Sequence, residues 1–195
     1  MKLKPYFAQL KVKRIGGPYE ILRFEKKEGE EIAVSELHTD GGIAAALAAR
    51  RINKLFPIQR FLMECVKSGR NILARSRAGT GKTIAFEIPI LEKISWRKRQ
   101  KCLAGAEVDV IVGTPKSVIQ MCKMDVVNLN AVQFTVLVET ARMLAVAVND
   151  VGVIMEKLPT RCQRIMFSAG ILSPNIRKFA KEYFRDLLTI DLVSA

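Results

Sequence analysis

The chain of 195 residues is 49% apolar and carries a formal net charge of +13, with an isoelectric point near 9.9. This length and apolar content suffice for one compact domain with a sizeable core, and no apolar run approaches the roughly 20 residues that span a bilayer. The N-terminus lacks a signal-peptide h-region, which argues against secretion, and the cysteines form no C-x-x-C pair, which argues against a zinc site. The basic balance favours a polyanionic partner, with nucleic acid as the first candidate and no membrane.

Residues 1–36 are predicted to form a charged N-terminal extension, and residues 37–195 one folded domain. The first 14 residues carry five basic side chains and no acidic one, as in a transit peptide, but they lack the Ser and Arg enrichment of such peptides. A solvated basic leader is therefore the favoured interpretation. We expect an intracellular location, with mitochondrion, chloroplast and nucleus left open.

Beyond this extension the chain alternates between helical and strand patterns. An alanine-rich helix is expected from Gly42 to Arg51, and Pro57, which suits a first helical turn, opens a second helix through about Lys67. Short apolar or β-branched runs predict strands. Strands separated by helices form parallel βαβ units, so the fold class is α/β with a parallel sheet and helices on both faces. The predicted strands are Ile72–Ala74, Asp109–Gly113, Phe134–Val138 and Arg164–Ser168, and the further helices are Ile84–Ile94 and Lys116–Cys122.

A phosphate-binding loop is predicted at Ser76–Thr83, between the strand and the helix that such a loop requires. Gly79 and Gly81 lack the Cβ that would block a tight turn, so successive N–H groups can point at phosphate oxygens. Lys82 would reach the β- and γ-phosphates, and the Thr83 hydroxyl would ligate Mg²⁺ at the positive end of the helix. The alternative, a glycine-rich turn before an ordinary helix, is disfavoured by the G-K-T ending and by both flanking elements. The predicted nucleotide contacts are Ser76, Arg77, Ala78, Gly79, Thr80, Gly81, Lys82 and Thr83.

Four segments fall at the carboxyl ends of the predicted strands, where ligands bind in parallel sheets. They are the phosphate loop, Gly113-Thr114, Glu139 and Ser168-Ala169. We therefore expect these segments to build one crevice.

Several motifs in this order resemble those of the DEAD-box RNA helicases, from about Leu37 to Val193. The L-F-P-I-Q segment that ends at Gln59 is similar to the Q motif, which contacts adenine, and it matches the plant organellar and nucleolar branch of that family. The remaining matches are Ser76–Thr83 to A-x-x-G-x-G-K-T, Val112–Pro115 to T-P-G-R, Val136–Leu144 to V-L-D-E-A-D-x-M-L, and Ser168–Gly170 to S-A-T.

This resemblance implies a three-layer RecA-like P-loop NTPase domain that binds ATP with Mg²⁺, and RNA. Phe56 and Gln59 would contact the nucleotide, and Glu139 would orient or activate the attacking water. Thr114 and Pro115 would contact the RNA backbone. ATP or ADP, Mg²⁺ and RNA are therefore the expected ligands.

These residues also have plain structural interpretations. Gln59 alone would be a surface helix residue, and Glu139 alone an ordinary strand-end acid. Thr114-Pro115 is equally well interpreted as a strand-ending turn, because the family's glycine and arginine are Lys116 and Ser117 here.

The sequence departs from the family pattern at positions that carry its chemistry. The metal-holding Asp is Val138, the last acid of the motif is Ala141, and the S-A-T threonine is Gly170, whereas Glu139 is kept. Metal-based charge stabilisation is worth several kcal/mol, and each roughly 1.4 kcal/mol changes a rate tenfold. We expect ATP hydrolysis to be slow or absent, with weakened nucleotide binding retained.

Larger parts of the family pattern are also missing. Between Leu103 and Ala104 the sequence lacks the strand that bears P-T-R-E-L, the helix after it and the glycine-pair segment, and it ends after the first RecA-like domain. We expect weak, sequence-independent RNA binding and a partner protein that supplies a second RecA-like domain. The favoured function is an ATP- and RNA-binding module of helicase descent with impaired unwinding. The alternative is a non-catalytic interaction or regulatory scaffold, or a truncated helicase product.

Overall fold

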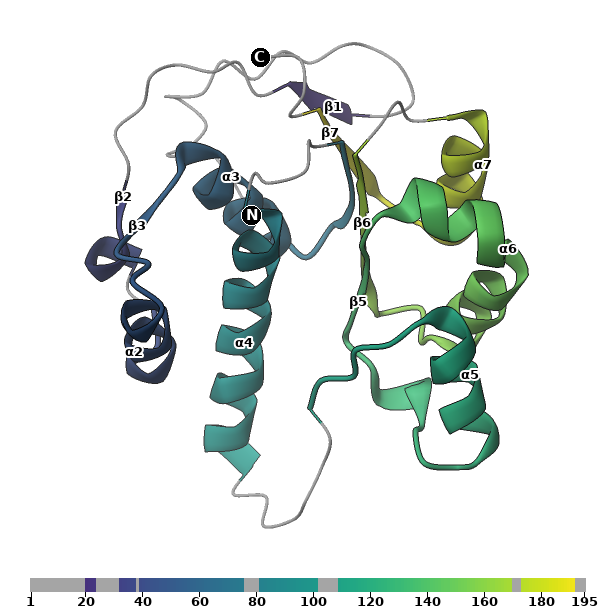
Figure 1. Cartoon of the computed structure of the whole chain (residues 1–195), viewed down its shortest axis with the longest axis horizontal. Helices are drawn as coiled ribbons and strands as arrows, with labels where there is room; N and C mark the ends of the chain where they lie inside the picture. Colours follow the sequence, from purple (N-terminus) through teal and green to yellow (C-terminus); the bar gives the residue numbers. More distant parts are fainter. Residues whose placement is uncertain are drawn as a thin grey trace.

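The computed structural model describes residues 20–23, 32–37, 39–75, 81–101, 109–169 and 173–191. Within these residues a five-stranded parallel sheet has the order β1-β7-β4-β6-β5, and β2 pairs with β3 in a separate antiparallel ribbon (Figure 1). The strands are β1 (Glu20–Arg23), β2 (Ile32–Ala33), β3 (Lys54–Leu55), β4 (Asn71–Arg75), β5 (Phe134–Leu137), β6 (Gln163–Ser168) and β7 (Leu187–Asp191).

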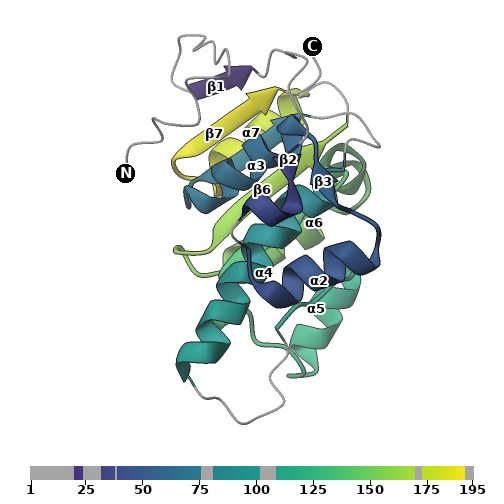
Figure 2. The same ribbon diagram turned by 90° about the vertical axis from the view of Figure 1, so that its left-hand side faces the viewer.

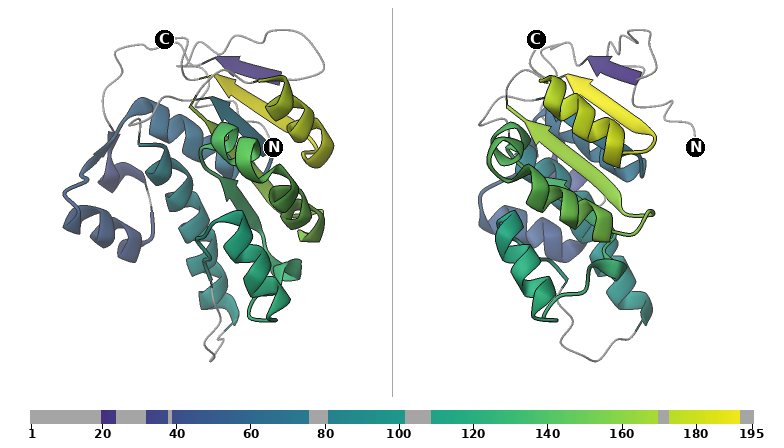
Figure 3. Two further views of the ribbon diagram at one scale, coloured as in Figure 1. Left: turned by 45° about the vertical axis from the view of Figure 1, so that its right-hand side comes forward. Right: turned by 90° about the vertical axis from the view of Figure 1, so that its right-hand side faces the viewer.

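Helices cover both faces of the sheet and make three layers. On one face lie α3 and α4, with α2 beside α4, and Figure 2 shows these helices in front of the strands. On the other face lie α5, α6 and α7, which come forward in Figure 3. The helices are α2 (Gly41–Ala49), α3 (Pro57–Lys67), α4 (Lys82–Lys101), α5 (Pro115–Lys123), α6 (Thr140–Lys157) and α7 (Pro174–Tyr183), with short 3-10 helices η1 (Val34–Leu37) and η2 (Leu129–Ala131). The predicted α/β class with a parallel sheet is confirmed.

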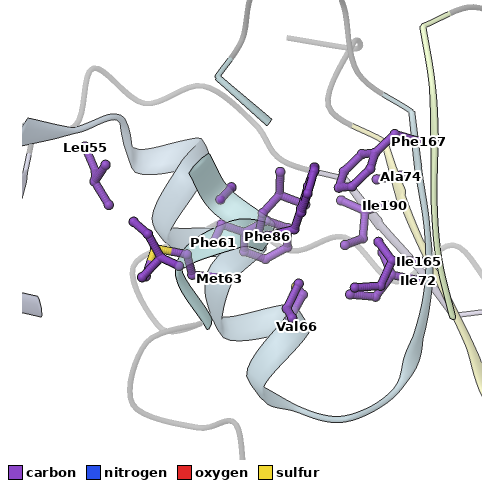
Figure 4. Close-up of a cluster of buried hydrophobic side chains, with 14 of the residues drawn as sticks. Leu55, Phe61, Met63, Val66, Ile72, Ala74, Phe86, Ile165, Phe167 and Ile190 are labelled. Atoms are coloured by element: carbon purple, nitrogen blue, oxygen red, sulfur yellow. The ribbon is translucent and has the colours of Figure 1, made fainter. Parts of the chain in front are cut away.

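The central strands are buried on both faces because successive side chains alternate between them. Ile72 and Ala74 of β4 lie in the apolar cluster beneath α3 and α4, whereas Leu73 lies in the cluster beneath α6 and α7. Figure 4 shows the first cluster, in which the rings of Phe86 and Phe167 have centroids 5.3 Å apart. Burial on both faces explains why these strands appear in the sequence as short continuous apolar runs.

The other predicted helices and strands are present, with shifted ends. α3 has the predicted bounds, while α4 continues past the predicted Ile94 to Lys101. Two strands of the main sheet were missed: β7, in which Thr189 interrupts the apolar run, and β1, which lies inside the predicted extension of residues 1–36. None of the helices in the described residues is long and apolar enough to cross a membrane.

The predicted strand at Asp109–Gly113 is wrong. These residues belong to no strand or helix, and the Val112 side chain is 92% exposed. A strand needs a neighbour to take up its backbone hydrogen bonds, and in the described part of the chain the sheet ends at β5. The segment therefore has strand-forming side chains without a strand to pair with.

Candidate functional site

The carboxyl ends of three neighbouring strands bring together three of the four predicted site segments; the fourth, Gly113-Thr114, follows no strand and precedes α5. Arg75, the last residue of β4, is paired with Ser168, the last residue of β6, and Leu137 of β5 is paired with Met166. The phosphate loop follows β4, Glu139 follows β5, and Ala169 follows β6, so these segments share one edge of the sheet. Ser76–Thr80 and Gly170 lie outside the described residues, as does the Lys82 side chain.

Gln59 connects the start of α3 to the end of the phosphate loop. Its side-chain oxygen accepts a hydrogen bond from the Phe56 N–H at 2.7 Å, and its Nε2 donates to the Gly81 carbonyl oxygen at 3.2 Å. Gln59 is only 4% exposed, so it is not the surface helix residue that its sequence position alone suggested. The phenyl ring of Phe56, next to it, is 55% exposed and free to stack on a ligand.

Gly81 has the conformation that only glycine adopts readily. Its φ is +67°, and a Cβ added there would collide with the Gln59 amide nitrogen. The close approach of the two residues therefore requires glycine at position 81. α4 begins directly after it at Lys82, so the backbone N–H groups of the first helical turn face the end of the phosphate loop.

The turn after β5 holds the acid kept from the family motif. Glu139 is the N-cap of α6, has left-handed backbone angles (φ 54°, ψ 45°), and makes no side-chain capping bond. Its side chain is exposed at the carboxyl edge of the sheet, and so is the neighbouring Val138, which is 42% exposed. The carboxylate is thus free for a ligand, whereas position 138 presents only methyl groups there.

Thr140 was missed by the sequence analysis. It is fully buried, and its hydroxyl lies 3.2 Å from the Leu137 carbonyl oxygen and 2.9 Å from the Phe167 carbonyl oxygen. The hydroxyl therefore joins the ends of β5 and β6 directly beneath Glu139. The sequence signal was a hydroxyl residue where the family motif has Ala.

Ser168, at the end of β6, has a buried hydroxyl with no hydrogen-bond partner among the described residues. The family's last motif acid is Ala141 here, and a methyl group cannot accept a hydrogen bond. A buried hydroxyl without a partner costs stability. The end of β6 therefore holds a buried polar group without a partner among the described residues.

The described residues do not fit a protein-held Mg²⁺ ion. They contain no group of three or more His, Cys, Asp or Glu side chains that could hold a metal. Among the described residues of the site, Thr83 has an exposed hydroxyl and Glu139 an exposed carboxylate, whereas Val138 offers no oxygen. The Asp191 carboxylate at the end of β7 is paired with Arg75. Mg²⁺ is usually held by carboxylates together with phosphates of the substrate, so the chain itself contributes little to binding it.

Thr114 has a local structural role. Its hydroxyl oxygen accepts the Ser117 N–H at 3.3 Å and lies 2.9 Å from the Ser117 hydroxyl, so it caps α5, whose first residue is Pro115. Threonine at the N-cap and proline after it are typical of a helix start. The observed geometry is that of a turn into a helix, with Thr114 itself exposed.

Comparison with known proteins agrees with this geometry. The model of the DEAD/DEAH box helicase family matches residues 56–104, which include Gln59, the phosphate loop and α4. The mitochondrial DEAD-box ATP-dependent RNA helicase 9 of Arabidopsis thaliana is 36% identical over an alignment of 213 positions, which covers 85% of this chain and 35% of the relative. DEAD-box helicase 53 of Oryza sativa is 34% identical, and the alignment covers 83% of this chain and 35% of the relative. The chloroplastic DEAD-box helicase 3B of Zea mays is 31% identical, and the alignment covers 87% of this chain and 30% of the relative. Over most of its length the chain is therefore similar to DEAD-box RNA helicases.

Solved structures of DEAD-box proteins have the same fold. A DEAD box protein from the hyperthermophile Methanococcus jannaschii superposes with a TM-score of 0.68 at 21% identity, covering 83% of this chain and 56% of that one. Saccharomyces cerevisiae Dbp5, in a complex with Gle1 and IP6, gives a TM-score of 0.69 at 20% identity, covering 85% and 54%. The chain spans about a third of the length of the plant helicases that it matches.

Proposed function

We propose that this domain binds ATP or ADP in the crevice at the carboxyl edge of its sheet and hydrolyses ATP poorly or not at all. The observation that carries the proposal is the bridge from Phe56 through Gln59 to Gly81. This bridge fixes the segment expected to contact adenine against the loop expected to hold the phosphates. In the proposal the phosphates bind to the loop Ser76–Thr83, with Lys82 as its charged contact, while Phe56 stacks on the base.

Impaired hydrolysis follows from the side chains at the ends of β5 and β6. Val138 provides no ligand for Mg²⁺, and Ala141 provides no polar group. In the proposal Glu139 orients the attacking water. Bound Mg²⁺ would neutralise charge on the phosphates, and this chain supports the ion with few oxygens. In the proposal a second RecA-like domain, supplied by a partner protein, provides the missing arginines.

A thermal-shift titration of the purified chain tests nucleotide binding. A ligand at a hundredfold excess over its dissociation constant adds about 2.7 kcal/mol of stability, which corresponds to about 5 to 10 °C for a domain of this size. We expect such a shift with ATP or ADP, a much smaller one in Lys82→Ala, and an unchanged one in Lys178→Ala, which replaces an exposed lysine of α7. Phe56→Ala should weaken binding while leaving the unliganded melting temperature unchanged. Equal shifts in the Lys82 and Lys178 variants would overturn the proposal.

Weak, sequence-independent RNA binding is also proposed, on the basis of the net charge of +13. Such binding depends on phosphate neutralisation, so the affinity should fall steeply as salt rises. Fluorescence anisotropy with several unrelated single-stranded RNAs measures it. Tight, sequence-selective binding that is insensitive to salt would contradict it.

The alternative function, a non-catalytic interaction scaffold, is favoured by a different observation. Val110, Ile111 and Val112 are exposed apolar side chains in a segment that pairs with no strand. Exposed apolar segments of this kind are typical of contact surfaces.

A further inference from the structure

The sheet has an open edge at β5. In the order β1-β7-β4-β6-β5 this strand has β6 on one side and no described strand on the other. The Gln163 N–H donates to the Gln133 carbonyl oxygen at 2.8 Å, so the backbone of residue 133 faces β6. Backbone groups alternate sides along a strand, and those of Phe134 and Val136 therefore face the open side. An edge of this kind is a template for another strand.

The same chain carries a segment that belongs to no strand but has the side chains of one. Residues 109–113 read D-V-I-V-G, and their three β-branched residues are exposed: 54% for Val110, 36% for Ile111 and 92% for Val112. β-branched residues favour a pleated, half-buried surface. Here most of their apolar surface lies in water, where its burial would be favourable.

The position of this segment is fixed at one end. Thr114 caps α5, and Val118 and Ile119 of that helix pack against the apolar cluster beneath α6 and α7. The segment leads into the N-terminus of α5, which lies in the layer that contains α6 (Figure 3). The sequence shows no match to the family's P-T-R-E-L strand before this segment, and among the described residues the sheet ends at β5.

We propose that two copies of this chain associate by reciprocal strand addition, in which residues 109–113 of each copy pair with the open edge of β5 in the other. Each copy offers one segment of five residues and one edge strand of four residues. In a pair of copies, each segment therefore pairs with the edge strand of the other copy, and the dimer is closed by twofold symmetry. The contact consists of backbone hydrogen bonds and apolar side chains. It does not depend on the nucleotide-binding proposal.

Charge gives this association a distinctive salt dependence. Each copy carries +13, so two copies repel one another, and salt screens that repulsion. The dimer should therefore become tighter as salt is raised. Association through an acidic peptide or an RNA bridge would show the opposite dependence, because salt weakens attraction between opposite charges.

Sedimentation velocity of the nuclease-treated chain over a concentration series, at about 0.15 M and about 1 M NaCl, tests the proposal. We expect a monomer–dimer equilibrium that shifts toward dimer at the higher salt. Val112→Lys should weaken dimerisation by more than about tenfold, since a lysine on an added strand blocks edge pairing. Val146→Lys is the matched control, because Val146 is 81% exposed on α6, outside both pairing segments. It should leave the dimer intact, and at concentrations where the unchanged chain is a monomer both variants should melt at its temperature.

Hydrogen exchange locates the contact. The amides of Phe134 and Val136 should gain protection as the protein concentration rises, and this gain should be lost in Val112→Lys. A monomer at every concentration and both salts would overturn the proposal. So would a dimer that Val112→Lys leaves unchanged, or one that dissociates as salt is raised.

Discussion

The Gln59 amide and Gly81 are in such close contact that a Cβ at position 81 fits only if the Gln59 amide moves. The amide nitrogen donates to the Gly81 carbonyl at 3.2 Å, and an added Cβ would overlap it. The contact ties α3 to the phosphate loop across 22 positions of sequence. It also sets the orientation of the loop's last residue before α4 begins.

Gly81→Ala is therefore expected to damage the loop as well as strain the backbone. An alanine at positive φ costs about 1 to 2 kcal/mol, and displacement of the Gln59 side chain adds to that cost. Gly69→Ala is the matched control, since Gly69 has φ +78° and nothing within 4 Å of an added Cβ. Urea denaturation should show a larger loss for Gly81→Ala, and nucleotide titration should show lost binding only there. Equal effects of the two substitutions on binding would contradict the role assigned to this contact.

The sequence was sufficient to predict the elements whose pattern is local. β4 and β6 are continuous apolar runs, and α3 begins at a proline, so each carries its own signal. The segment 109–113 has an equally strong local pattern and is not a strand. Its state depends on whether another strand lies beside it, which is a property of the whole sheet rather than of five residues.

In the site, too, residues with a local sequence signal were predicted and residues whose role depends on distant neighbours were not. The phosphate loop and Gln59 were found because their spacing follows a motif. Thr140 was missed because its role depends on the carbonyl of Phe167, which comes from another strand 27 positions later. The orphaned hydroxyl of Ser168 was likewise invisible, since the sequence alone does not show which acceptors surround a side chain.

Thr140→Val tests the link between the ends of β5 and β6. Valine keeps the shape of threonine but cannot donate a hydrogen bond, so the buried Leu137 and Phe167 carbonyls lose this donor. The expected loss is about 1 to 3 kcal/mol of unfolding free energy. Thr140→Ser keeps the donor and should cost less. Urea denaturation measures both, and a serine variant as unstable as the valine variant would show that packing, not the hydroxyl, is what matters here.

Ser168→Ala should be neutral or slightly stabilising, because it removes a buried hydroxyl that lacks a partner among the described residues. Ala141→Asp restores an acid at an exposed position beside this edge of the sheet. If the restored carboxylate accepts a hydrogen bond from Ser168, the two substitutions should couple by about 0.5 to 3 kcal/mol in a double-mutant cycle. Additive effects on stability would mean that the two side chains do not meet.

Val138→Asp tests why hydrolysis is expected to fail. The new carboxylate would stand at the exposed end of β5, beside Glu139, and supply the oxygen that the site lacks for Mg²⁺. We expect the ratio of the ATP affinity in Mg²⁺ to the ATP affinity in EDTA to be about tenfold higher in this variant than in the unchanged chain. Val146→Asp, which places the same charge at an exposed position of α6, is the control and should leave that ratio unchanged.

Turnover should stay low even in Val138→Asp. The charge that develops on the transferred phosphoryl group is normally stabilised by arginines as well as by metal, and in the proposal those arginines come from a partner. Steady-state phosphate release, with and without RNA, should therefore remain far below the scale of about 1 per second of working enzymes. RNA-stimulated release near that scale in the unchanged chain, abolished by Lys82→Ala, would show that Val138 and Ala141 matter less than their chemistry indicates.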